Sequence, residues 1–463
     1  MSERSGDHAI VLGGSIAGLL AARVLADAYD QVTVVDRDQL LPGSNPRRGT
    51  PQGRHIHALL ARGQQVLEQL FPGFTAELAG HGAPIGDVLG DARLLFGGHR
   101  LARAEAGLVA LSASRPLLED RIRARVRALP EVRFAPPSDA VGLRCSREGR
   151  RVTGVRLLRR ADASADEVID ADLVIDATGR GSRAPAWLQS LGFGQPRADR
   201  LQVDVGYVTR RYQLPLDSLD GDLACIHGPT PGSPRGGALA RLEGDIWMLT
   251  LFGMVGDHPP KDPEGFDAFL RSLCFPDLHD AVGAAEPVDG PAGYRFQANV
   301  RRRYERMRQF PEGFLVMGDA LCSFNPIYGQ GMTVAALQAI ALRDHLQAGI
   351  APRSQRVLRA LARATDAPWE LAIGADLTVP EVDGRRTPRR RIAGAYVTRL
   401  QAAAARDPAL ARAFVRVTGL VDRPEALLQP SIAARVLRAR THAISAAERH
   451  SDPVDGHPGM QAR

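Results

Sequence analysis

Residues 313–332 read Gly-Phe-Leu-Val-Met-Gly-Asp-Ala-Leu-Cys-Ser-Phe-Asn-Pro-Ile-Tyr-Gly-Gln-Gly-Met, and the predicted architecture is organised around this stretch. The apolar residues Phe314–Met317 predict a buried strand. That strand ends at Gly318, a residue without a side chain, which is followed by the carboxylate of Asp319. The end of the strand therefore combines a bare backbone with a negative charge.

The loop that follows contains Pro326, Gly329 and Gly331, and an apolar-rich helix is predicted from about Met332 to Leu346. A helix N-terminus carries N–H groups without intrahelical partners and the positive end of the helix dipole, so it attracts negative charge. The glycines let a flat or anionic ligand approach the backbone itself. Taken alone, the pattern also fits a plain strand, loop and helix with glycine as punctuation, and the first fifty residues favour the ligand-binding interpretation.

The chain begins with another Gly-rich loop between a strand and a helix. The apolar strand His8–Leu12 leads into Gly13-Gly-Ser-Ile-Ala-Gly18, a helix follows, and a second strand, Val32–Val35, ends at Asp36. This order of strand, loop, helix, strand and acid is the fingerprint of a dinucleotide-binding βαβ unit. We therefore predict a Rossmann-like unit at the start of the chain.

Each position of the fingerprint has a physical task. Gly13 makes the tight turn, and Gly18 allows the helix to pack closely on the strand. Ser15 stands where the fingerprint has its middle glycine. The helix N-terminus accepts a pyrophosphate, and Asp36 can accept hydrogen bonds from a ribose hydroxyl. The residues expected to contact the dinucleotide are Gly13, Ser15, Ala17, Gly18, Asp36 and Arg37.

Further candidate residues follow in three segments. The run Ala171–Gly179 predicts a buried strand that delivers Asp176 and Gly179 to a loop. Arg115 stands on the first turn of a predicted helix, where a solvent-facing arginine is an equally good interpretation from the pattern alone. Arg48 lies in an earlier loop that is rich in glycine, proline and arginine.

No metal or disulfide site is predicted. His55 and His57 could share a metal on an extended strand, but no third ligand is visible, and a loop–helix junction with incidental histidines is favoured. The four cysteines are far apart and form no CxxC motif, so we expect reduced thiols.

Composition and charge exclude several classes of protein. Of the 463 residues, 44% are hydrophobic and 24% are charged, which is typical of a globular protein. The net charge is +7, but the arginines are mostly interleaved with acidic residues, and aromatic residues, at 5%, are too sparse to stack bases. Despite a local basic cluster at 385–391, we predict no nucleic-acid partner. The polar start and the lack of a long apolar run predict a cytoplasmic protein with no membrane span.

The length predicts two or three domains. Residues 193–298 show short alternating strands and form a candidate inserted, mainly β domain. The chain is rich in Ala, Arg and Leu after position 349 and is predicted to be helical over 350–440, with a flexible polar tail at 441–463. The fold class is therefore α/β, with a β insertion and a C-terminal helical region.

Taken in order, the stretches 13–36, 176–183 and 318–332 resemble the para-hydroxybenzoate-hydroxylase-like flavoprotein monooxygenases. The resemblance in spacing runs from residue 8 to about 345, and the C-terminal helices resemble the branch that includes the flavin epoxidases of polyether biosynthesis. It implies an FAD-binding domain of the glutathione-reductase type made from 1–192 and 299–349, with 71–103 partly contributing to the substrate side.

The resemblance also implies roles for particular residues. Asp36 is expected at the adenosine ribose and Asp319 at the ribityl chain, while Arg48 and Arg115 resemble the arginines that contact the cofactor. The loop under the isoalloxazine would carry out the catalytic work through its backbone. The implied residues of that loop and of the strand before it are Gly318, Pro326, Gly329, Gln330, Gly331 and Met332.

The implied activity is insertion of one oxygen atom from O2 into a lipophilic substrate, by hydroxylation or alkene epoxidation, through a flavin C4a-hydroperoxide. The middle motif reads Asp176-Ala-Thr-Gly179, where many hydroxylases that use NAD(P)H have Asp-Gly. Electrons are therefore expected from NAD(P)H either directly or through a separate flavin reductase. The expected substrate is an intermediate of natural-product biosynthesis, and the apolar residues that could line its pocket are Val203, Val205, Tyr207, Trp247, Leu249, Leu251 and Phe252.

Three alternatives remain at this point. A reductase or dehydrogenase of the same fold, acting on an isoprenoid- or polyketide-like substrate, would keep the same FAD motifs. A flavin halogenase needs a lysine between flavin and substrate and a Trp-x-Trp-x-Ile-Pro stretch, whereas the only lysine here is Lys261, in a turn-like segment, and no such Trp pair exists. An arginine-rich protein that carries flavin structurally predicts salt-sensitive binding to nucleic acid or membranes without turnover.

Overall fold

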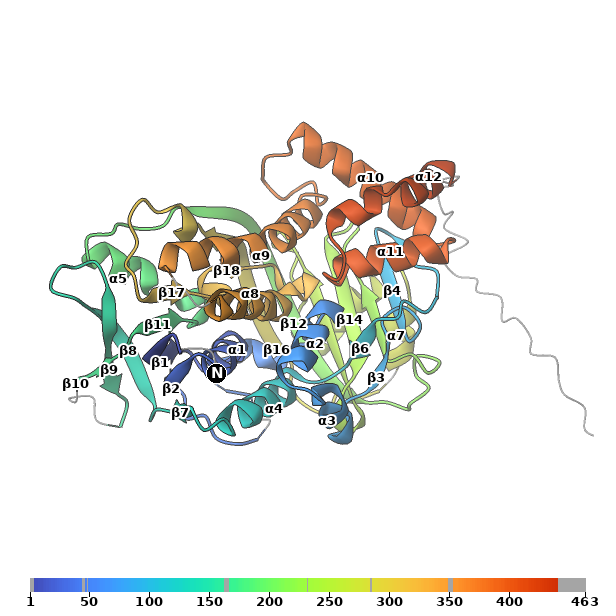
Figure 1. Ribbon diagram of the computed structural model, residues 1–463. Helices are drawn as coiled ribbons and strands as arrows, with labels where there is room; N and C mark the ends of the chain where they lie inside the picture. Colours follow the sequence, from blue (N-terminus) through green and yellow to red (C-terminus); the bar gives the residue numbers. More distant parts are fainter. Residues whose placement is uncertain are drawn as a thin grey trace, which may run out of the picture.

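The computed structural model describes residues 4–43, 46–47, 49–161, 166–230, 232–283, 285–348 and 353–439. A parallel sheet with its helices lies beside a larger mixed sheet, and the last helices pack over the outer edge of the larger sheet (Figure 1). The fold class is the predicted α/β. The tail expected to be flexible, 441–463, lies outside the described residues.

The dinucleotide-binding fingerprint forms the centre of a five-stranded sheet in which every pair of neighbours is parallel. Parallel strands are buried on both faces, which is why they are continuous apolar runs in the sequence. The strand order is β17-β11-β1-β2-β7. The bounds are β1 (Gly6–Leu12), β2 (Tyr29–Val35), β7 (Val132–Phe134), β11 (Leu173–Asp176) and β17 (Phe314–Val316).

The register of this sheet brings the three predicted motifs to one edge. Leu12 pairs with Asp176, and Asp176 pairs with Val316, although these residues are far apart in the sequence. Because the strands are parallel, the loops that follow β1, β11 and β17 leave the sheet side by side. Ligands bind at this carboxyl edge in open α/β sheets.

A layer of helices that contact one another packs against the parallel sheet, which the antiparallel strands 138–145 and 152–159 also contact. The helix α1 (Ile16–Leu25) is buried along most of its length and packs against α8 (Gln330–Gln347), which begins two residues before the predicted start. The helix α4 (Arg115–Arg127) contacts α1 and begins with the cap Ser114, whose hydroxyl accepts a hydrogen bond from the N–H of Leu117 at 3.2 Å. The shorter helices are α2 (Ala61–Leu70), α3 (Phe74–Gly80) and α5 (Ala184–Ser190).

The second large sheet has eight strands in the order β18-β16-β12-β15-β14-β13-β4-β5. Its bounds are β4 (Ala92–Phe96), β5 (His99–Arg100), β12 (Ala198–Gln213), β13 (Ala224–His227), β14 (Arg235–Arg241), β15 (Ile246–Gly253), β16 (Ala292–Arg302) and β18 (Cys322–Ser323). Two strands of this sheet, β4 and β5, come from within 71–103. The long strand β16 continues through the expected domain boundary between 298 and 299.

Two smaller sheets complete the strands of the described chain. The strands β8 (Ser138–Cys145), β9 (Val152–Arg159) and β10 (Asp166–Asp170) form an antiparallel sheet at the far side of the parallel one (Figure 1). The strands β3 (Ile85–Asp87) and β6 (Val109–Leu111) form a short antiparallel pair.

The two faces of the eight-stranded sheet have different neighbours. One face packs on α6 (Pro263–Arg271) and α7 (Asp277–Val282), and its side chains form a separate hydrophobic core. The other face turns toward the parallel sheet and the C-terminal helices. Those helices are α9 (Ser354–Asp376), α10 (Pro388–Ala404), α11 (Pro408–Thr418) and α12 (Pro430–Arg438).

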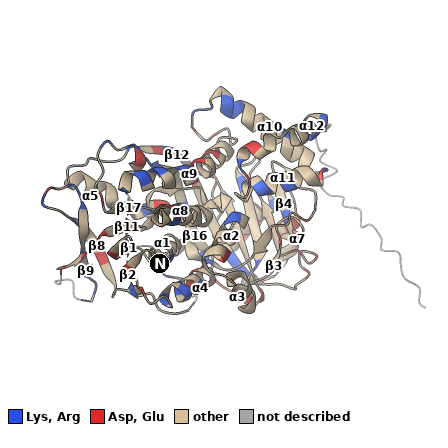
Figure 2. Cartoon of the chain, in the orientation of Figure 1, with Lys and Arg blue, Asp and Glu red and all other residues tan. Residues whose placement is uncertain are grey.

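Charged residues are spread over almost every element, with basic and acidic positions interleaved (Figure 2). Many of the described arginines form ion pairs, as Arg93 does with Asp220, Asp222 and Asp277. Within the described residues, no helix is both long enough and apolar enough to cross a membrane.

Candidate active site

One cavity of about 2250 Å³ extends from the loop after β1 to the C-terminal helices. The three loops at the carboxyl edge of the parallel sheet line one end, and the inner face of the eight-stranded sheet lines the middle. The predicted residues on its wall are Gly13, Ser15, Ala17, Asp36, Arg37, Arg115, Gly179, Gly318, Asp319, Pro326, Gly329, Gln330, Gly331 and Met332.

The fingerprint glycines are required by close backbone contacts. Gly13 has φ +103°, and a Cβ atom there would lie 2.5 Å from the carbonyl oxygen of Ala177. A Cβ at Gly18 would lie only 1.7 Å from the carbonyl oxygen of Gly13. Gly18 therefore serves the packing of α1 on β1 and is not part of the cavity wall, whereas Gly13 reaches it.

Asp36 is held by the Gly-rich loop that it faces. Its Oδ2 atom accepts a hydrogen bond from the N–H of Gly14 at 2.7 Å, and its Oδ1 atom accepts from the N–H of Asp38 at 2.8 Å. The carboxylate lines the cavity at the end of β2, where a ribose hydroxyl would be recognised. Arg47 Nη1 lies 3.5 Å from the same carboxylate.

Ser15, the departure from the fingerprint, belongs to a buried charge network. Its hydroxyl donates to Glu119 Oε2 at 2.6 Å and accepts from Arg115 Nη2 at 2.8 Å. Arg47 donates to the other oxygen of Glu119 from Nε at 2.9 Å and from Nη2 at 2.6 Å. Burial alone would raise the pKa of Glu119, but Arg115 and Arg47 outweigh it and lower the pKa. The hydroxyl thus joins α1 to α4.

The arginine that the structure brings to the cavity from the 41–54 loop is Arg47. Arg48, the predicted one, lies outside the described residues. In a loop containing both arginines, the sequence had no signal to decide between them. Arg115 lines the cavity and is buried, and its Nε has no hydrogen-bond partner in the described structure. A buried donor without a partner at a cavity wall is suited to a ligand oxygen.

Asp176 differs from its predicted role, because it lies behind the wall and not on it. Its Oδ1 accepts from the N–H and the hydroxyl of Thr178 at 2.9 and 2.6 Å, and its Oδ2 accepts from the hydroxyl of Ser182 at 2.6 Å. Burial raises its pKa, partly offset by these donors. Asp176 therefore shapes the loop that presents Gly179 and Arg180 to the cavity.

Asp319 contrasts with Asp176. Its carboxylate faces the cavity at the end of β17, and within the described residues it has no hydrogen-bond partner. Burial raises its pKa, and Arg180, Arg115 and Arg302 act in the opposite direction. A carboxylate that is enclosed, unpaired and surrounded by distant arginines is arranged to accept hydrogen bonds from a ligand.

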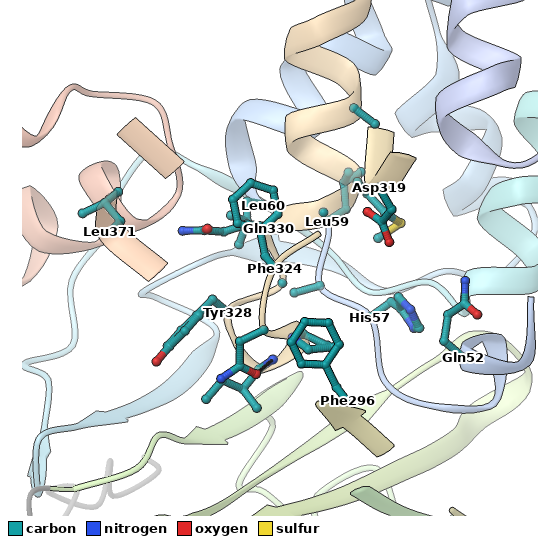
Figure 3. A pocket seen from close by; sticks show the side chains of 18 of the residues that line it. Gln52, His57, Leu59, Leu60, Phe296, Asp319, Phe324, Tyr328, Gln330 and Leu371 are labelled. Atoms are coloured by element: carbon teal, nitrogen blue, oxygen red, sulfur yellow. Dashed lines mark hydrogen bonds between the residues drawn. The ribbon is translucent and has the colours of Figure 1, made fainter. Parts of the chain in front are cut away.

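The loop 325–329 and the start of α8 form the next part of the wall. Asn325 caps a short 3-10 helix, Pro326–Tyr328, and Gly329 adopts a left-handed conformation with φ +63° immediately before α8. Figure 3 shows Asp319 and His57 on one side of the pocket and Tyr328 and Gln330 on the other. The first N–H groups of α8 are free of intrahelical partners, so they favour a ligand with negative charge.

His55 and His57 line the cavity, a role that the sequence did not predict. His55 Nδ1 is 2.7 Å from Thr209 Oγ1, and His57 Nδ1 is 2.9 Å from the carbonyl oxygen of His55. Burial, with Arg54 second, lowers the pKa of His55 to about 4, and burial, with Arg115 second, lowers that of His57 to about 3. Both rings are therefore neutral at physiological pH.

The middle of the cavity is bounded by one face of the eight-stranded sheet. Tyr207 and Phe252 lie there as predicted, but Trp247, Leu249 and Leu251 point to the opposite face and pack with α6 and α7. Val203 and Val205 are buried in the main core. The sheet residues that do line the cavity are Ala92, Leu94, Phe96, Tyr207, Ala224, Ile226, Ala238, Ala240, Thr250, Phe252, Tyr294 and Phe296.

The C-terminal helices close the far end of the cavity. Leu371 on α9, Val397 on α10 and Phe414 on α11 contribute apolar wall. Ile392 and Leu428 also line it and are 72% and 62% exposed, so the mouth itself is apolar. Three arginines of the basic cluster, Arg385, Arg389 and Arg390, lie at this end. No pattern in the sequence indicated that these helices reach the site.

Metal chemistry has no support in the described residues, since no three His, Cys, Asp or Glu side chains are grouped there to hold an ion. The described cysteines form no disulfide with one another, and none lines the cavity.

The donor set fits a dinucleotide. Gly13 and the N-terminus of α1 would receive a pyrophosphate, and Asp36 a ribose. The carboxylate of Asp319, the Nε atom of Arg115 and the N-terminus of α8 would contact the second half of the molecule. These features lie along one continuous cavity, which matches the extended shape of FAD.

The chain is similar in sequence to curated proteins over most of its length. It is 35% identical over 431 residues to Protein Rv3254 of Mycobacterium tuberculosis, covering 90% of each chain. It is 26% identical over 359 residues to a kynurenine 3-monooxygenase of Salinispora tropica, covering 74% of each. No family model matches the chain.

Solved structures share the fold at low sequence identity. The flavin-dependent brominase Bmp2 superposes with a TM-score of 0.67 at 14% identity, covering 93% of this chain and 97% of that one. The p-nitrophenol 4-monooxygenase PnpA of Pseudomonas putida DLL-E4 superposes with a TM-score of 0.63 at 16% identity, covering 92% of this chain and 100% of that one. The FAD-dependent monooxygenase fold expected from the resemblance is confirmed. The chain is therefore an enzyme of the FAD-dependent monooxygenase class, and it belongs to the family of Protein Rv3254 of Mycobacterium tuberculosis.

Proposed function

We propose that the enzyme inserts one oxygen atom from O2 into a lipophilic organic substrate, by hydroxylation or alkene epoxidation. The observation that carries this proposal is the single cavity that joins the cofactor site to an apolar sheet face. At about 2250 Å³ it is more than twice the ~1,000 Å³ upper range of ordinary ligand pockets, which leaves room for FAD and a second large molecule. Bound FAD, once reduced, supplies the oxygen-activating chemistry.

The protein residues have three tasks in this proposal. The N-terminus of α8, with Gly329, Gln330 and Gly331, stabilises negative charge on the ring system. Asp319 and Arg115 orient the cofactor. Neutral His55 and His57, with the aromatic wall, would exclude water and charge from this part of the site.

The middle of the cavity supports an apolar substrate with at least one polar group. Small residues, Ala224, Ala238 and Ala240, leave space over the sheet. Tyr207, Thr250 and Tyr294 are polar residues of this sheet face, and the hydroxyl of Tyr294 accepts a hydrogen bond from Arg180 at 2.8 Å. A hydroxyl or carbonyl on the substrate would find donors there.

We also propose the division of labour predicted from the sequence. Residues 1–192 and 299–349 bind FAD, 193–298 with part of 71–103 contact the substrate, and 350–440 close the cavity. A place in natural-product biosynthesis and membership of the polyether-epoxidase branch remain proposals that rest on the sequence resemblance. The proposed electron source is NAD(P)H, used directly or through a separate flavin reductase. The second route is included because Ala177 stands where many hydroxylases that use NAD(P)H directly have glycine.

Two other activities would use the same fold. A halogenase is disfavoured because Lys261 is absent from the described cavity wall, and its carbonyl oxygen is bound by Arg210 at 2.9 Å. A reductase or dehydrogenase acting on an isoprenoid- or polyketide-like substrate needs the same cofactor residues, and only turnover can separate it from an oxygenase.

The test uses the purified chain loaded with FAD, reduced and then exposed to ¹⁸O2 in the presence of a panel of apolar alkenes and phenols. Mass spectrometry should find a product that has gained one labelled oxygen atom. Product labelled from water, or a saturated product without oxygen, would overturn the proposal. A preference for a small dicarboxylate or a sugar would overturn the substrate class.

A further inference from the structure

A buried hydrogen-bond network lies behind the loop that precedes α8. Its centre is Asp376, the last residue of α9, which is completely buried. The carboxylate accepts three hydrogen bonds, from Asn299 Nδ2 at 2.6 Å, from Asn325 Nδ2 at 2.7 Å and from the Tyr328 hydroxyl at 2.8 Å. The network therefore joins α9 to β16 and to the loop.

The network has only one consistent arrangement of donors and acceptors. The Oδ1 atom of Asn299 accepts from the N–H of Asn325 at 2.6 Å, and the Oδ1 atom of Asn325 accepts from the N–H of Ile327 at 3.3 Å. Both amide oxygens are thus occupied by backbone donors, so both NH₂ groups must face Asp376. The side chain at position 376 must therefore accept hydrogen bonds from both NH₂ groups, as a carboxylate does.

The network lies between two parts of the cavity wall. Pro326, Ile327 and Tyr328 line the cavity on one side. On α9, the neighbours Leu371, Gly374 and Ala375 line it as well, while Asp376 itself points into the protein. Figure 3 shows Tyr328 and Leu371 at the same end of the pocket. A ligand that presses on α9 therefore acts on the helix that holds the loop.

We infer that Asp376 is a positioning residue that fixes the loop 325–329 from α9, so that the substrate side of the cavity sets the geometry of the loop at the cofactor. The inference rests on the proposed function, because it assigns the loop to FAD. Asp376 does not touch the cavity. Its effect on a bound cofactor passes through Asn325 and Tyr328.

The charge of Asp376 gives this role a measurable signature. Burial raises its pKa to about 6, with Asn325, Tyr328 and Asn299 acting in the opposite direction. The titratable groups that face it are Tyr328 and Tyr207, whose pKa values are raised first by burial and then by Asp376, so both stay protonated between pH 5 and 8. Only Asp376 changes charge in this cluster over that range.

The test compares FAD-loaded wild type with Asp376→Asn, Tyr328→Phe and the control Asp383→Asn, whose carboxylate is exposed. The midpoint potential of the flavin is measured from pH 5 to 8. In wild type it should show an extra fall as the pH rises through about 6, because the newly ionised Asp376 opposes negative charge gained at the loop. Asp376→Asn should abolish this step and shift the visible flavin spectrum, whereas Asp383→Asn should change neither.

Hydrogen exchange of residues 325–329 in the cofactor-free protein provides a second readout. It should be faster in Asp376→Asn and, to a smaller extent, in Tyr328→Phe, which removes one donor and keeps the fold measurable if Asp376→Asn does not fold. Wild-type potential and exchange in a folded Asp376→Asn or Tyr328→Phe variant would overturn the inference. Failure of the wild type to bind FAD would instead overturn the proposed function.

Discussion

Asp176 ends β11 and Asp319 follows the neighbouring parallel strand β17, and the same substitution should have opposite effects on stability at the two positions. Asp319→Asn replaces an enclosed carboxylate that has no hydrogen-bond partner in the described protein, so no protein contact is lost. Asp176→Asn takes an acceptor from Thr178 or Ser182, because an amide cannot accept at both atoms. In the cofactor-free protein, Asp319→Asn should therefore raise the free energy of unfolding, whereas Asp176→Asn should lower it by about 1 kcal/mol.

Binding of FAD should respond in the opposite sense at position 319. A hydrogen bond to a charged group contributes about 1.5–3 kcal/mol, so Asp319→Asn should weaken FAD binding by about 10- to 150-fold. Asp176→Asn should have a smaller effect, because its carboxylate does not reach the cavity. Flavin fluorescence titration of the cofactor-free protein measures affinity, and thermal unfolding of the same preparations measures stability.

The stability gain of Asp319→Asn should also depend on pH. Burial raises the pKa of Asp319, so the wild type is fully stable at this site below the ordinary carboxylate pKa of about 3.9 and loses stability as the pH rises through the raised value. The variant should gain nothing near pH 3 and most near pH 7. A fall in stability at pH 7 together with unchanged FAD affinity would show that Asp319 is a structural residue and refute the reasoning.

Three further changes test other parts of the site. Gly18→Ala should lower the free energy of unfolding in urea by about 3 kcal/mol, because the new Cβ would lie 1.7 Å from the Gly13 carbonyl oxygen and the backbone would have to move. An unchanged urea midpoint would contradict the close packing of α1 on β1. Glu119→Gln should lower the free energy of unfolding by about 3–5 kcal/mol at pH 7 in the same urea experiment, because Arg47 and Arg115 lose their buried counter-charge. Since the pKa of Glu119 is lowered in the folded protein, the difference between variant and wild type should shrink as the pH falls below the ordinary carboxylate range of about 4. Ala240→Trp should raise KM for the largest substrate found in the oxygenation screen and leave FAD affinity unchanged, because this residue lines the cavity over the sheet; weakened FAD binding would mean that the cofactor extends there.

The parts of the fold that were predictable from sequence have a strong local cause. Gly18 and Asp36 are tied to their positions by backbone contacts within a single βαβ unit, so the residues themselves carry the information. The apolar strand before Asp319 is buried on both faces and is continuous for that reason. The parallel pairing of Leu12, Asp176 and Val316 then unites three motifs that the sequence could place only in order.

The wall of the substrate cavity was less predictable, and β15 shows why. Alternation along a strand tells which residues share a face, but not which face is turned to the cavity. In Ile246–Gly253 both faces are apolar and buried, because one meets α6 and α7 and the other meets the cavity. Trp247, Leu249 and Leu251 were therefore assigned to the wrong side.

The remaining site residues are placed by contacts between segments that are distant in the sequence. Asp376 reaches Asn325 across 51 residues and Asn299 across 77, and no local pattern marks an aspartate at the end of an amphipathic helix as a hydrogen-bond centre. The same holds for Leu371, Val397 and Phe414, which are ordinary helix-packing residues in the sequence. Their role depends on how the C-terminal helices dock, and docking is decided by the summed shape of two surfaces.

The difference between the locally constrained loops and the cavity wall formed by distant segments bears on how the enzyme selects its substrate. At the end of the cavity that fits the dinucleotide, Gly13, Gly18 and Asp36 are constrained by close backbone contacts and hydrogen bonds. The end proposed for the substrate is lined by apolar residues of β4, β13 and β14 and of the C-terminal helices, where many side chains satisfy the same packing. A brominase and a p-nitrophenol monooxygenase can therefore share the fold with this chain at 14% and 16% identity and still transform different molecules. The determinants of substrate choice should accordingly be sought at Ala238, Ala240, Leu371 and Phe414 before the cofactor loops.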